Sequence, residues 1–431
     1  MERVCVLGGQ GIEEVGRVLL LAGGIPQAVM ADCFRRRGYV VIMVDYNELP
    51  PGKLHADYYY QESTLDVKSV AEIAKREQVD LIATCCTDQA VATMSTVSEM
   101  LGLPCYVDSD TGQAVTNKIS MKRLLLENGI PTARQFQLES LWDLPQYCYP
   151  LVVKPANCNS SKAVSIVTCE EELDAALRVA RSASRTSSAI VEEYVEGLEY
   201  SIDAVVVNGI AEVLCVSRSD KLSSVPGFVI CRGQYVPSVH TRLYSEALEL
   251  VNKIAAAFGL MNCPLLVQVL EGSDGLKVVE LSARTGGCIK YQLIRESSGV
   301  DIIDWTTELL LGSISPVLPA MRSEIVSNEF IYAPNGTLCS LGGIEPCLES
   351  RWISRAYTFF NAGDSRGQIK SSGDRVAALT IVARNHEEYE WKRKKALNTI
   401  RVVGIDGKDL TFREESYDTF NGCACDGREQ W

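Results

Sequence analysis

The sequence predicts a mixed α/β and α+β protein with more than one lobe. In the first third of the chain, short apolar runs alternate with segments of helical length, as in a parallel sheet covered by helices on both faces. In the middle, apolar runs are joined by tight turns, which favours antiparallel hairpins. The C-terminal part again mixes strand-like runs with a charged helix. At roughly 150 residues per domain, 431 residues suggest about three domains.

The composition excludes several classes of protein. The chain has 42 Lys and Arg against 55 Asp and Glu, a formal net charge of −13, whereas a nucleic-acid binder needs a basic face. No apolar run approaches the ~20 residues that a membrane-spanning helix needs, and the first residues lack the layout of a signal peptide. We therefore expect a cytoplasmic protein with no nucleic-acid and no membrane partner.

Cysteine and histidine usage argues against a zinc site. The 16 cysteines are spread along the chain without a CxxC pair, and there are 3 histidines, so the usual spacing of zinc ligands is absent. We interpret the thiols as reduced and mostly buried. The shortage of histidine also disfavours a Ser-His or Cys-His nucleophile.

The first third predicts a parallel sheet whose first strand ends in the turn Gly8-Gly9-Gln10-Gly11. A dinucleotide-binding fingerprint would need a further glycine at position 14, where Glu14 would repel a pyrophosphate. We therefore interpret the glycines as a tight turn between a strand and a helix. The expected strands are residues 3–7, 39–44, 79–84 and 105–107, and the expected helices are residues 26–37, 66–77 and 88–101.

The middle of the chain predicts a second lobe that begins near residue 112. Lys118 and Lys122 are four residues apart on a predicted helix and therefore share a face. Asn208-Gly209 lies between two apolar runs, which is the strongest short-range signal of a hairpin. The expected helices are residues 117–128 and 170–181, and the expected strands are residues 149–154, 163–167, 189–193, 198–207 and 210–217.

A second hairpin contains the residues that most clearly indicate chemistry. Its strands are residues 264–270 and 276–282. Pairing around the turn brings Gln268 opposite or near Glu280, and strand alternation puts Glu280, Ser282 and Arg284 on one face. Gln and Glu oxygens suit Mg²⁺, and an arginine suits negative charge on a phosphoryl group or an acyl phosphate. The alternative is a solvated hairpin edge.

Four motifs, taken in order, resemble the ATP-grasp superfamily. They are Asn117-Lys118 with the turn at 129–131, Val152-Val153-Lys154-Pro155, residues 192–201, and residues 280–287. Each motif is weak by itself, but their order and spacing extend the resemblance over nearly the whole chain. The resemblance implies an N-terminal parallel α/β domain at 1–112, an ATP-grasp domain at 113–322 with a small lobe at about 150–215, and a C-terminal α+β region at 323–431 that completes the core.

The resemblance also implies which residues surround ATP and the metal. Those near the nucleotide would be Lys118 and Lys154 at the phosphates, Ser160 and Ser161 in a phosphate flap, Glu193 and Val195 at the adenine through backbone groups, and Glu199 at the ribose. Mg²⁺ or Mn²⁺ would be bound by Gln268, Glu280 and Ser282. The catalytic residues would be Arg284, beside the reacting phosphate, and Lys221, at the terminal phosphates.

The sequence departs from the family pattern at two positions. Ser282 stands where the family usually has Asn, and Ala163 replaces a usual Gly beside the flap. In addition, Gln268 at the first metal position resembles the carbamoyl-phosphate synthetase branch more than the ligases. Simpler interpretations stay open as well, with Lys118 as a solvated helix lysine and the glutamates of residues 192–199 as an acidic surface loop. Arg232 and His240 lie in a loop that is a candidate for substrate contact.

The activity implied by the resemblance is that of an ATP-dependent carboxylate–amine ligase. A carboxylate would attack the γ-phosphate to give an acyl phosphate and ADP, and an amine would then displace phosphate. Because the C-terminal region resembles the amino-acid ligases, we expect small-molecule acid and amine substrates of the amino-acid type, and a homodimer at the level of the family. Two alternatives stay open, namely an enzyme that phosphorylates bicarbonate or formate, and a nucleotide-binding protein without catalysis.

Overall fold

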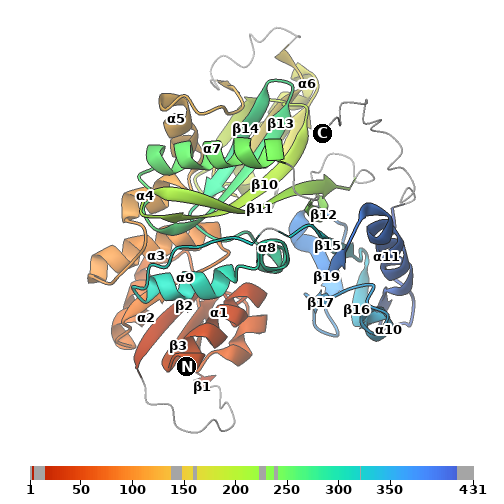
Figure 1. The fold of residues 1–431 in the computed structure, drawn as a ribbon, viewed down its shortest axis with the longest axis horizontal. Coiled ribbons are helices and arrows are strands. Elements are labelled where there is room, and N and C mark those ends of the chain that lie inside the picture. The colour runs from red at the N-terminus through yellow and green to blue at the C-terminus, as the bar shows by residue number, and fades with distance from the viewer. Residues whose placement is uncertain are drawn as a thin grey trace.

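The computed structural model describes residues 2–3, 15–136, 148–158, 163–222, 230–236, 241–320 and 322–414. Its strands form four sheets of five, eight, four and three strands. The five-stranded sheet is mostly parallel and the others are antiparallel, which confirms the predicted combination of α/β and α+β structure. In Figure 1 the parallel sheet lies at one end of the molecule, and the eight-stranded sheet runs across the middle towards the C-terminal region.

The N-terminal lobe contains the parallel sheet, with strand order β1-β4-β3-β2-β5 and β1 antiparallel at the edge. Two helix boundaries follow from local chemistry. The Asp66 side chain accepts hydrogen bonds from two backbone N–H groups at the start of α2, and Gly102 ends α3 with a φ of 67°. The elements are β1 (Glu2–Arg3), β2 (Gly16–Leu21), α1 (Ile25–Arg36), β3 (Tyr39–Asp45), β4 (Tyr58–Gln61), α2 (Val67–Arg76), β5 (Leu81–Ala83), α3 (Asp88–Leu101) and α4 (Ser109–Ala114).

The sequence analysis missed the central strand of this sheet. β2 pairs with β3 on one side and with β5 on the other, and the turn Ala22-Gly23-Gly24 leads from it into α1. The expected strand at residues 3–7 is described only at Glu2–Arg3, and the turn at 8–11 lies outside the described residues. Both runs are apolar, so hydrophobicity did not distinguish them. The expected strand at 105–107 is wrong, because these residues form a bend.

The eight-stranded sheet has the order β14-β13-β10-β11-β12-β15-β19-β17, so it joins hairpins from the middle of the chain to strands from the C-terminal region. Pairing of β12 with β15 connects the two parts. The elements of this region are α5 (Lys118–Glu127), β10 (Leu198–Val207), β11 (Ile210–Lys221), β12 (Cys231–Val236), α7 (Thr241–Ala257), β13 (Cys263–Gly272), β14 (Gly275–Ser282), α8 (Lys290–Ser298), α9 (Ile302–Leu310), β15 (Ile325–Tyr332), β17 (Arg355–Thr358) and β19 (Arg375–Ala383).

The two smaller sheets complete the fold. The four-stranded sheet, ordered β6-β9-β7-β8, draws its strands from residues 135–193, whereas the hairpin of β10 and β11 belongs to the eight-stranded sheet. Its elements are β6 (Gln135–Phe136), β7 (Leu151–Pro155), β8 (Ser165–Val167), α6 (Glu170–Ala183) and β9 (Ala189–Glu193). The three-stranded sheet and its helices are β16 (Gly336–Gly342), α10 (Ile344–Glu349), β18 (Ser365–Arg366), α11 (His386–Thr399) and β20 (Arg401–Gly404).

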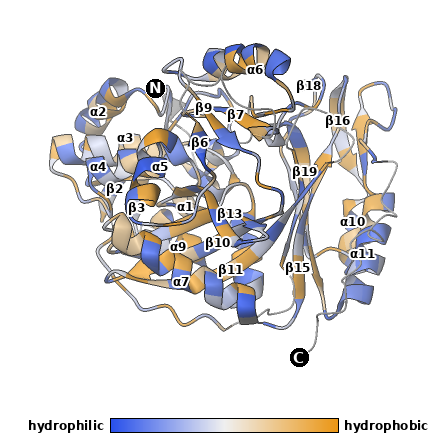
Figure 2. Cartoon of the chain, turned by 90° about the horizontal axis from the view of Figure 1, so that it is seen from above, coloured by the Kyte–Doolittle hydropathy of each residue, from blue (hydrophilic) through white to orange (hydrophobic). Residues whose placement is uncertain are grey.

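Buried apolar side chains determine which parts are packed together. One cluster contains Leu19 of the parallel sheet, Val267 of the large sheet and Ile254 of α7, so these elements share a core. The four-stranded sheet packs with α6 around a separate cluster that includes Leu151 and Leu173. In Figure 2 the central strands are largely orange, while α11 shows much blue towards the outside. Within the described part of the chain, no helix has the length and apolar character needed to cross a membrane.

Candidate active site

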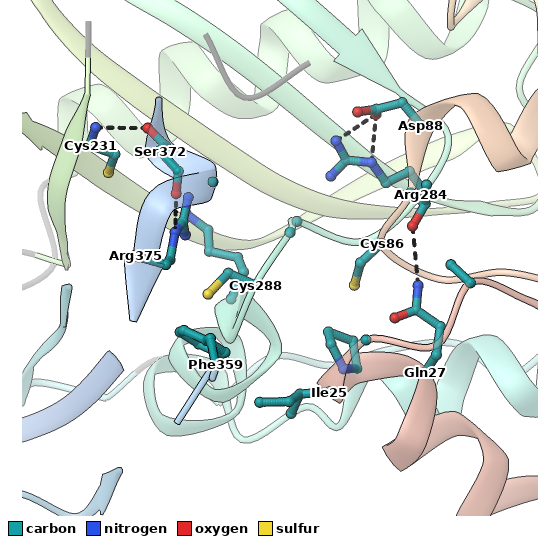
Figure 3. Close-up of a pocket in the computed structure, with 18 of the residues that line it drawn as sticks. Ile25, Gln27, Cys86, Asp88, Cys231, Arg284, Cys288, Phe359, Ser372 and Arg375 are labelled. Atoms are coloured by element: carbon teal, nitrogen blue, oxygen red, sulfur yellow. Dashed lines mark hydrogen bonds and ion pairs between the residues drawn. The ribbon is translucent and has the colours of Figure 1, made fainter. Parts of the chain in front are cut away.

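A cavity of about 610 Å³ lies where the N-terminal lobe, the large sheet and the C-terminal region meet. Residues 22–27, which include the turn after β2 and the start of α1, line one part of it. The large sheet contributes Glu199, Lys221, Gln268 and Glu280, and the C-terminal region contributes Arg375. Five of the predicted site residues therefore reach this cavity, since Arg284 also lines it (Figure 3).

The predicted hairpin and its pairing are confirmed. Gln268 of β13 is directly opposite Glu280 of β14, and a bulge follows Gln268. The Glu280 carboxylate lies 3.3 Å from the ammonium of Lys118. Burial alone would raise the pKa of Glu280, but the positive charges of Lys118, Lys154 and Arg284 outweigh it and the pKa is lowered. Glu280 is thus an ionised carboxylate among three cations.

Ser282 is the last residue of β14, and Arg284 follows two residues later. Both line a small hollow together with Lys118 and Glu280, and the Ser282 hydroxyl is buried without a hydrogen-bond partner. Arg284 is 6% exposed, and its Nε donates to the Asp88 carboxylate at 2.6 Å. Asp88 is the first residue of α3, so the N-terminal lobe holds this guanidinium at the cavity wall.

Lys154 belongs to a buried cluster that the sequence analysis missed in part. Its ammonium lies 2.7 Å from one oxygen of Glu192, and the ammonium of Lys122 lies 3.0 Å from the other. Glu192 is at most 3% exposed and Lys122 1%. Burial lowers the pKa of Lys122 to about 8, although Glu192 opposes this shift. The spacing of Lys118 and Lys122 in the sequence predicted that both lysines lie on one helix face. It could not predict Glu192, the partner of Lys122, because Glu192 lies on β9, about 70 residues further along the chain.

Glu199 and Lys221 form an ion pair at the cavity wall. The Lys221 Nζ donates to the Glu199 carboxylate at 2.8 Å, from the end of β11 to the start of β10. Burial would lower the pKa of Lys221, but the Glu199 carboxylate outweighs burial and raises it. Lys221 is therefore a charged ammonium that faces the same cavity as Gln268 and Glu280.

The residues predicted to bind adenine lie apart from the walls of this cavity. Glu193 ends β9, and its backbone N–H donates to the Arg134 carbonyl at 2.9 Å. Its carboxylate accepts from the Arg134 backbone N–H at 3.1 Å and lies 3.4 Å from Lys277. The Glu193 N–H therefore already has a protein acceptor.

The remaining candidates have mixed outcomes. Ser160, Ser161 and His240 lie outside the described residues. Arg232 is ion-paired with Asp220 at 3.2 Å and is not among the residues that line the cavity. A GxSxG pattern at residues 363–367 was overlooked in the sequence. It falls on β18, which pairs antiparallel with β16, whereas a nucleophile elbow needs a turn from a strand into a helix.

Two buried or cavity-lining cations carried no signal in the sequence. Lys290 at the start of α8 is fully buried and lies 3.3 Å from Asp203 of β10. Burial raises the pKa of Asp203. Arg375 lines the cavity from the first position of β19. Each is a single basic residue in an ordinary helix or strand pattern, and only the tertiary fold brings it to the site.

The oxygen atoms of Gln268, Glu280 and Ser282 fit a hard cation that needs few protein ligands. Among the described residues, no group of three or more His, Cys, Asp or Glu side chains is placed to hold a metal. Gln268 and Glu280 instead offer paired oxygens at the cavity, and the buried Ser282 hydroxyl lies next along the strand without a partner. Mg²⁺ is commonly bound by one or two carboxylates together with substrate phosphates and water.

Comparison with known proteins identifies the central region. Residues 147–292 match the model of the ATP-grasp domain. The L-arginine-specific L-amino acid ligase of Bacillus subtilis is 24% identical over 293 residues, which cover 65% of this chain and 70% of that protein. Multifunctional proteins and carbamoyl phosphate synthase large chains are also similar to this chain, which spans 13 to 27% of their length.

Solved structures with the same fold cover most of the chain. An L-amino acid ligase from Bacillus licheniformis superimposes with a TM-score of 0.74 at 20% identity and covers 91% of this chain and 100% of its own. The biotin carboxylase domain of Hydrogenobacter thermophilus 2-oxoglutarate carboxylase, solved with MgADP and bicarbonate, also gives a TM-score of 0.74, at 17% identity, and covers 90% of this chain and 91% of its own. At these identities the likeness establishes the fold.

Proposed function

Starting from the ATP-grasp domain at residues 147–292, we propose that this protein is an ATP-dependent carboxylate–amine ligase. The carboxylate of one substrate attacks the γ-phosphate of ATP, which gives an acyl phosphate and ADP. The amine of a second substrate then attacks the acyl carbon and releases phosphate, so that a C–N bond forms. The similarity to two L-amino acid ligases supports amino acids as the substrate class.

The observation that supports this proposal most strongly is the charge arrangement around Glu280. An ionised carboxylate lies among three cations and directly opposite Gln268, at the edge of a cavity large enough for several ligand groups. A purely structural hairpin would not keep these charges at a cavity wall, because isolated buried charges are costly. Phosphate oxygens and a cation would bind the same groups that now pair with one another.

Within this proposal, the chain's cations bind and neutralise phosphate charge. Lys118 and Lys154 bind the ATP phosphates, and Lys221 leaves Glu199 to reach the terminal phosphate while Glu199 binds the ribose. Arg284, held by Asp88, stabilises negative charge on the transferring phosphoryl group. No protein nucleophile is required, since the substrate carboxylate is the attacking group. Catalysis then consists mainly of positioning and charge stabilisation.

The metal would be Mg²⁺, held by Gln268 and Glu280, with Ser282 as a third oxygen. When bound, it would neutralise phosphate charge and orient the phosphate oxygens. The adenine would bind to the backbone of Glu193 and Val195. We also propose the domain division 1–112, 113–322 and 323–431, with a small lobe formed by the four-stranded sheet, because that sheet has its own apolar core.

The test is phosphate release from Mg·ATP over a grid of amino acids and small carboxylates, alone and in pairs, with mass detection of amides. The proposal predicts release with particular pairs only, together with an amide product, and at least a hundredfold loss in Glu280→Ala. Glu349→Gln, which changes an exposed carboxylate at the end of α10 outside the proposed site, is the control.

Release with labelled bicarbonate and no amide would instead support the carboxylase-like alternative, which Gln268 favours. ATP binding without release under any condition would contradict an enzymatic role and support the nucleotide-binding alternative, to which Ser282 points.

A further inference from the structure

Arg375 differs from the other buried or half-buried arginines around the cavity. Arg284 is paired with Asp88, and Arg366, which also lines the cavity, is paired with Asp364. Arg375 lines the cavity but forms no ion pair with any carboxylate in the described part of the chain, and the titratable groups that act on its charge are the thiols of Cys288 and Cys231 and the hydroxyl of Tyr332. Its positive charge at the cavity wall is therefore not balanced by a protein acid.

The guanidinium of Arg375 is nevertheless held in place. Its Nε donates to the backbone carbonyl of Ser372, and its Cζ atom lies over the Phe330 ring, 4.4 Å from the ring centre. These two contacts use the Nε–H group and one side of the guanidinium group. A side-chain hydrogen bond to the Cys288 thiol adds a third contact, which is weak because sulfur is a poor acceptor. The terminal nitrogens can therefore still donate to a ligand, in the geometry that a carboxylate accepts with both oxygens.

The side chains that contact Arg375 are uncharged. Phe330, Phe359, Cys231 and Cys288 line this part of the cavity, and burial raises the pKa of the Cys231 thiol, so that it stays protonated. In Figure 3 the group formed by Arg375, Ser372, Cys231, Cys288 and Phe359 lies on the side opposite Arg284 and Asp88. An anion bound at Arg375 is therefore a different group from the one that reacts beside Arg284.

We propose that Arg375 binds the carboxylate of the amine substrate, so that this substrate is a free amino acid and the product keeps a free carboxylate. The inference rests on the proposed ligase function, because it assigns a second substrate group to the same cavity. The acid that is activated lies at Glu280 and Arg284, and the amino acid that attacks it is oriented from the opposite wall by its own carboxylate.

Binding measurements test this assignment without requiring turnover. The wild-type protein, saturated with ADP and Mg²⁺, is titrated calorimetrically with the common L-amino acids and with their carboxamides. We expect at least one amino acid to bind roughly 10- to 100-fold more tightly than its carboxamide, as expected for the loss of a charge-assisted bidentate contact. Arg375→Met should bind both forms equally, while its affinity for ADP stays at the wild-type value.

Matched variants separate recognition from folding. Arg375→Lys keeps the positive charge but loses the two parallel N–H donors of the guanidinium, so it should retain part of the preference for amino acids over carboxamides. This variant also provides the test if Arg375→Met does not fold. Arg355→Met, an exposed arginine at the first position of the neighbouring strand β17, is the control and should behave as wild type. O-phosphoethanolamine, an amine that bears a phosphate group, tests whether a phosphate is the preferred anion.

The outcomes are distinct. The assignment would be overturned if Arg375→Met kept the full preference for carboxylates over carboxamides, or if the wild type bound both equally. It would also be overturned if O-phosphoethanolamine bound more tightly than the amino acids and did so through Arg375. Arg375-dependent binding of amino acids without any ATP turnover would support the assignment and contradict the ligase function. Turnover with amines that lack a carboxylate at wild-type efficiency would support the ligase function and overturn the role of Arg375.

Discussion

The carboxylate of Glu192 lies 2.7 Å from the ammonium of Lys154, and both side chains are buried. Lys122 approaches the second oxygen at 3.0 Å. Two lysines thus share one carboxylate, which leaves the cluster with an excess of positive charge. Glu192 is in this sense a positioning residue, since it holds Lys154 from β9 while Lys154 faces the charges around Glu280.

Glu192→Gln is expected to destabilise the protein strongly. The substitution leaves two buried ammonium groups without a carboxylate, and removal of one partner from a buried ion pair costs about 3–5 kcal/mol. Urea denaturation followed by circular dichroism measures the effect. Glu196→Gln, an exposed glutamate four residues along the chain, should change the free energy of unfolding by less than about 0.5 kcal/mol. A Glu192→Gln variant as stable as this control would contradict the structural role.

Lys122 should make the stability depend on pH in the alkaline range. Burial lowers its pKa from 10.5 to about 8, so between these two pH values the unfolded chain binds a proton that the folded chain has released. The free energy of unfolding of the wild type should therefore rise with pH relative to Lys122→Met, by at most about 1.4 kcal/mol per pH unit. A difference that stays constant from pH 7.5 to 10.5 would argue against the lowered pKa. Lys253→Met, an exposed lysine of α7, controls for the loss of one lysine.

Lys221→Met is expected to lower ATP turnover at least about 100-fold, because under the proposed function it removes the ammonium that reaches the terminal phosphate. The variant also leaves Glu199 without its partner at 2.8 Å, so nucleotide affinity should fall as well. Single-turnover kinetics, with the substrate pair identified by the phosphate-release screen, separates the chemical step from nucleotide binding. The exposed-lysine variant Lys253→Met should match the wild type. Wild-type turnover in Lys221→Met would remove this residue from the catalytic set.

Gln268→Glu should lower the Mg²⁺ concentration needed for half-maximal activity, because a second carboxylate opposite Glu280 strengthens the binding of a hard cation. Without Mg²⁺ the two carboxylates repel each other, so the melting temperature of the metal-free variant should fall. Gln61→Glu, an exposed glutamine at the end of β4, adds the same charge elsewhere. An unchanged Mg²⁺ dependence in Gln268→Glu would show that residue 268 does not face the metal.

Local patterns predicted the hairpin chemistry well. The alternation of apolar residues, together with the turn at 273–275, was sufficient to place Gln268 opposite Glu280, because strand pairing across a short turn is a local event. The first parallel strand was missed, since residues 3–7 and 16–21 are both short apolar runs. Only pairing with β3 and β5 distinguishes the second as the centre of the sheet.

By itself, the sequence determined the order of most strands and helices, the mixed fold class, the ATP-grasp resemblance and the residues of the β13–β14 hairpin. These depend on periodicity, turns and motifs that act over short distances along the chain. The tertiary structure alone decided that Asp88 holds Arg284, that Glu192 joins Lys154 to Lys122, and that Arg375 reaches the cavity without an acid partner. Such contacts join residues tens to hundreds of positions apart, and no local pattern records which distant charges the fold brings together.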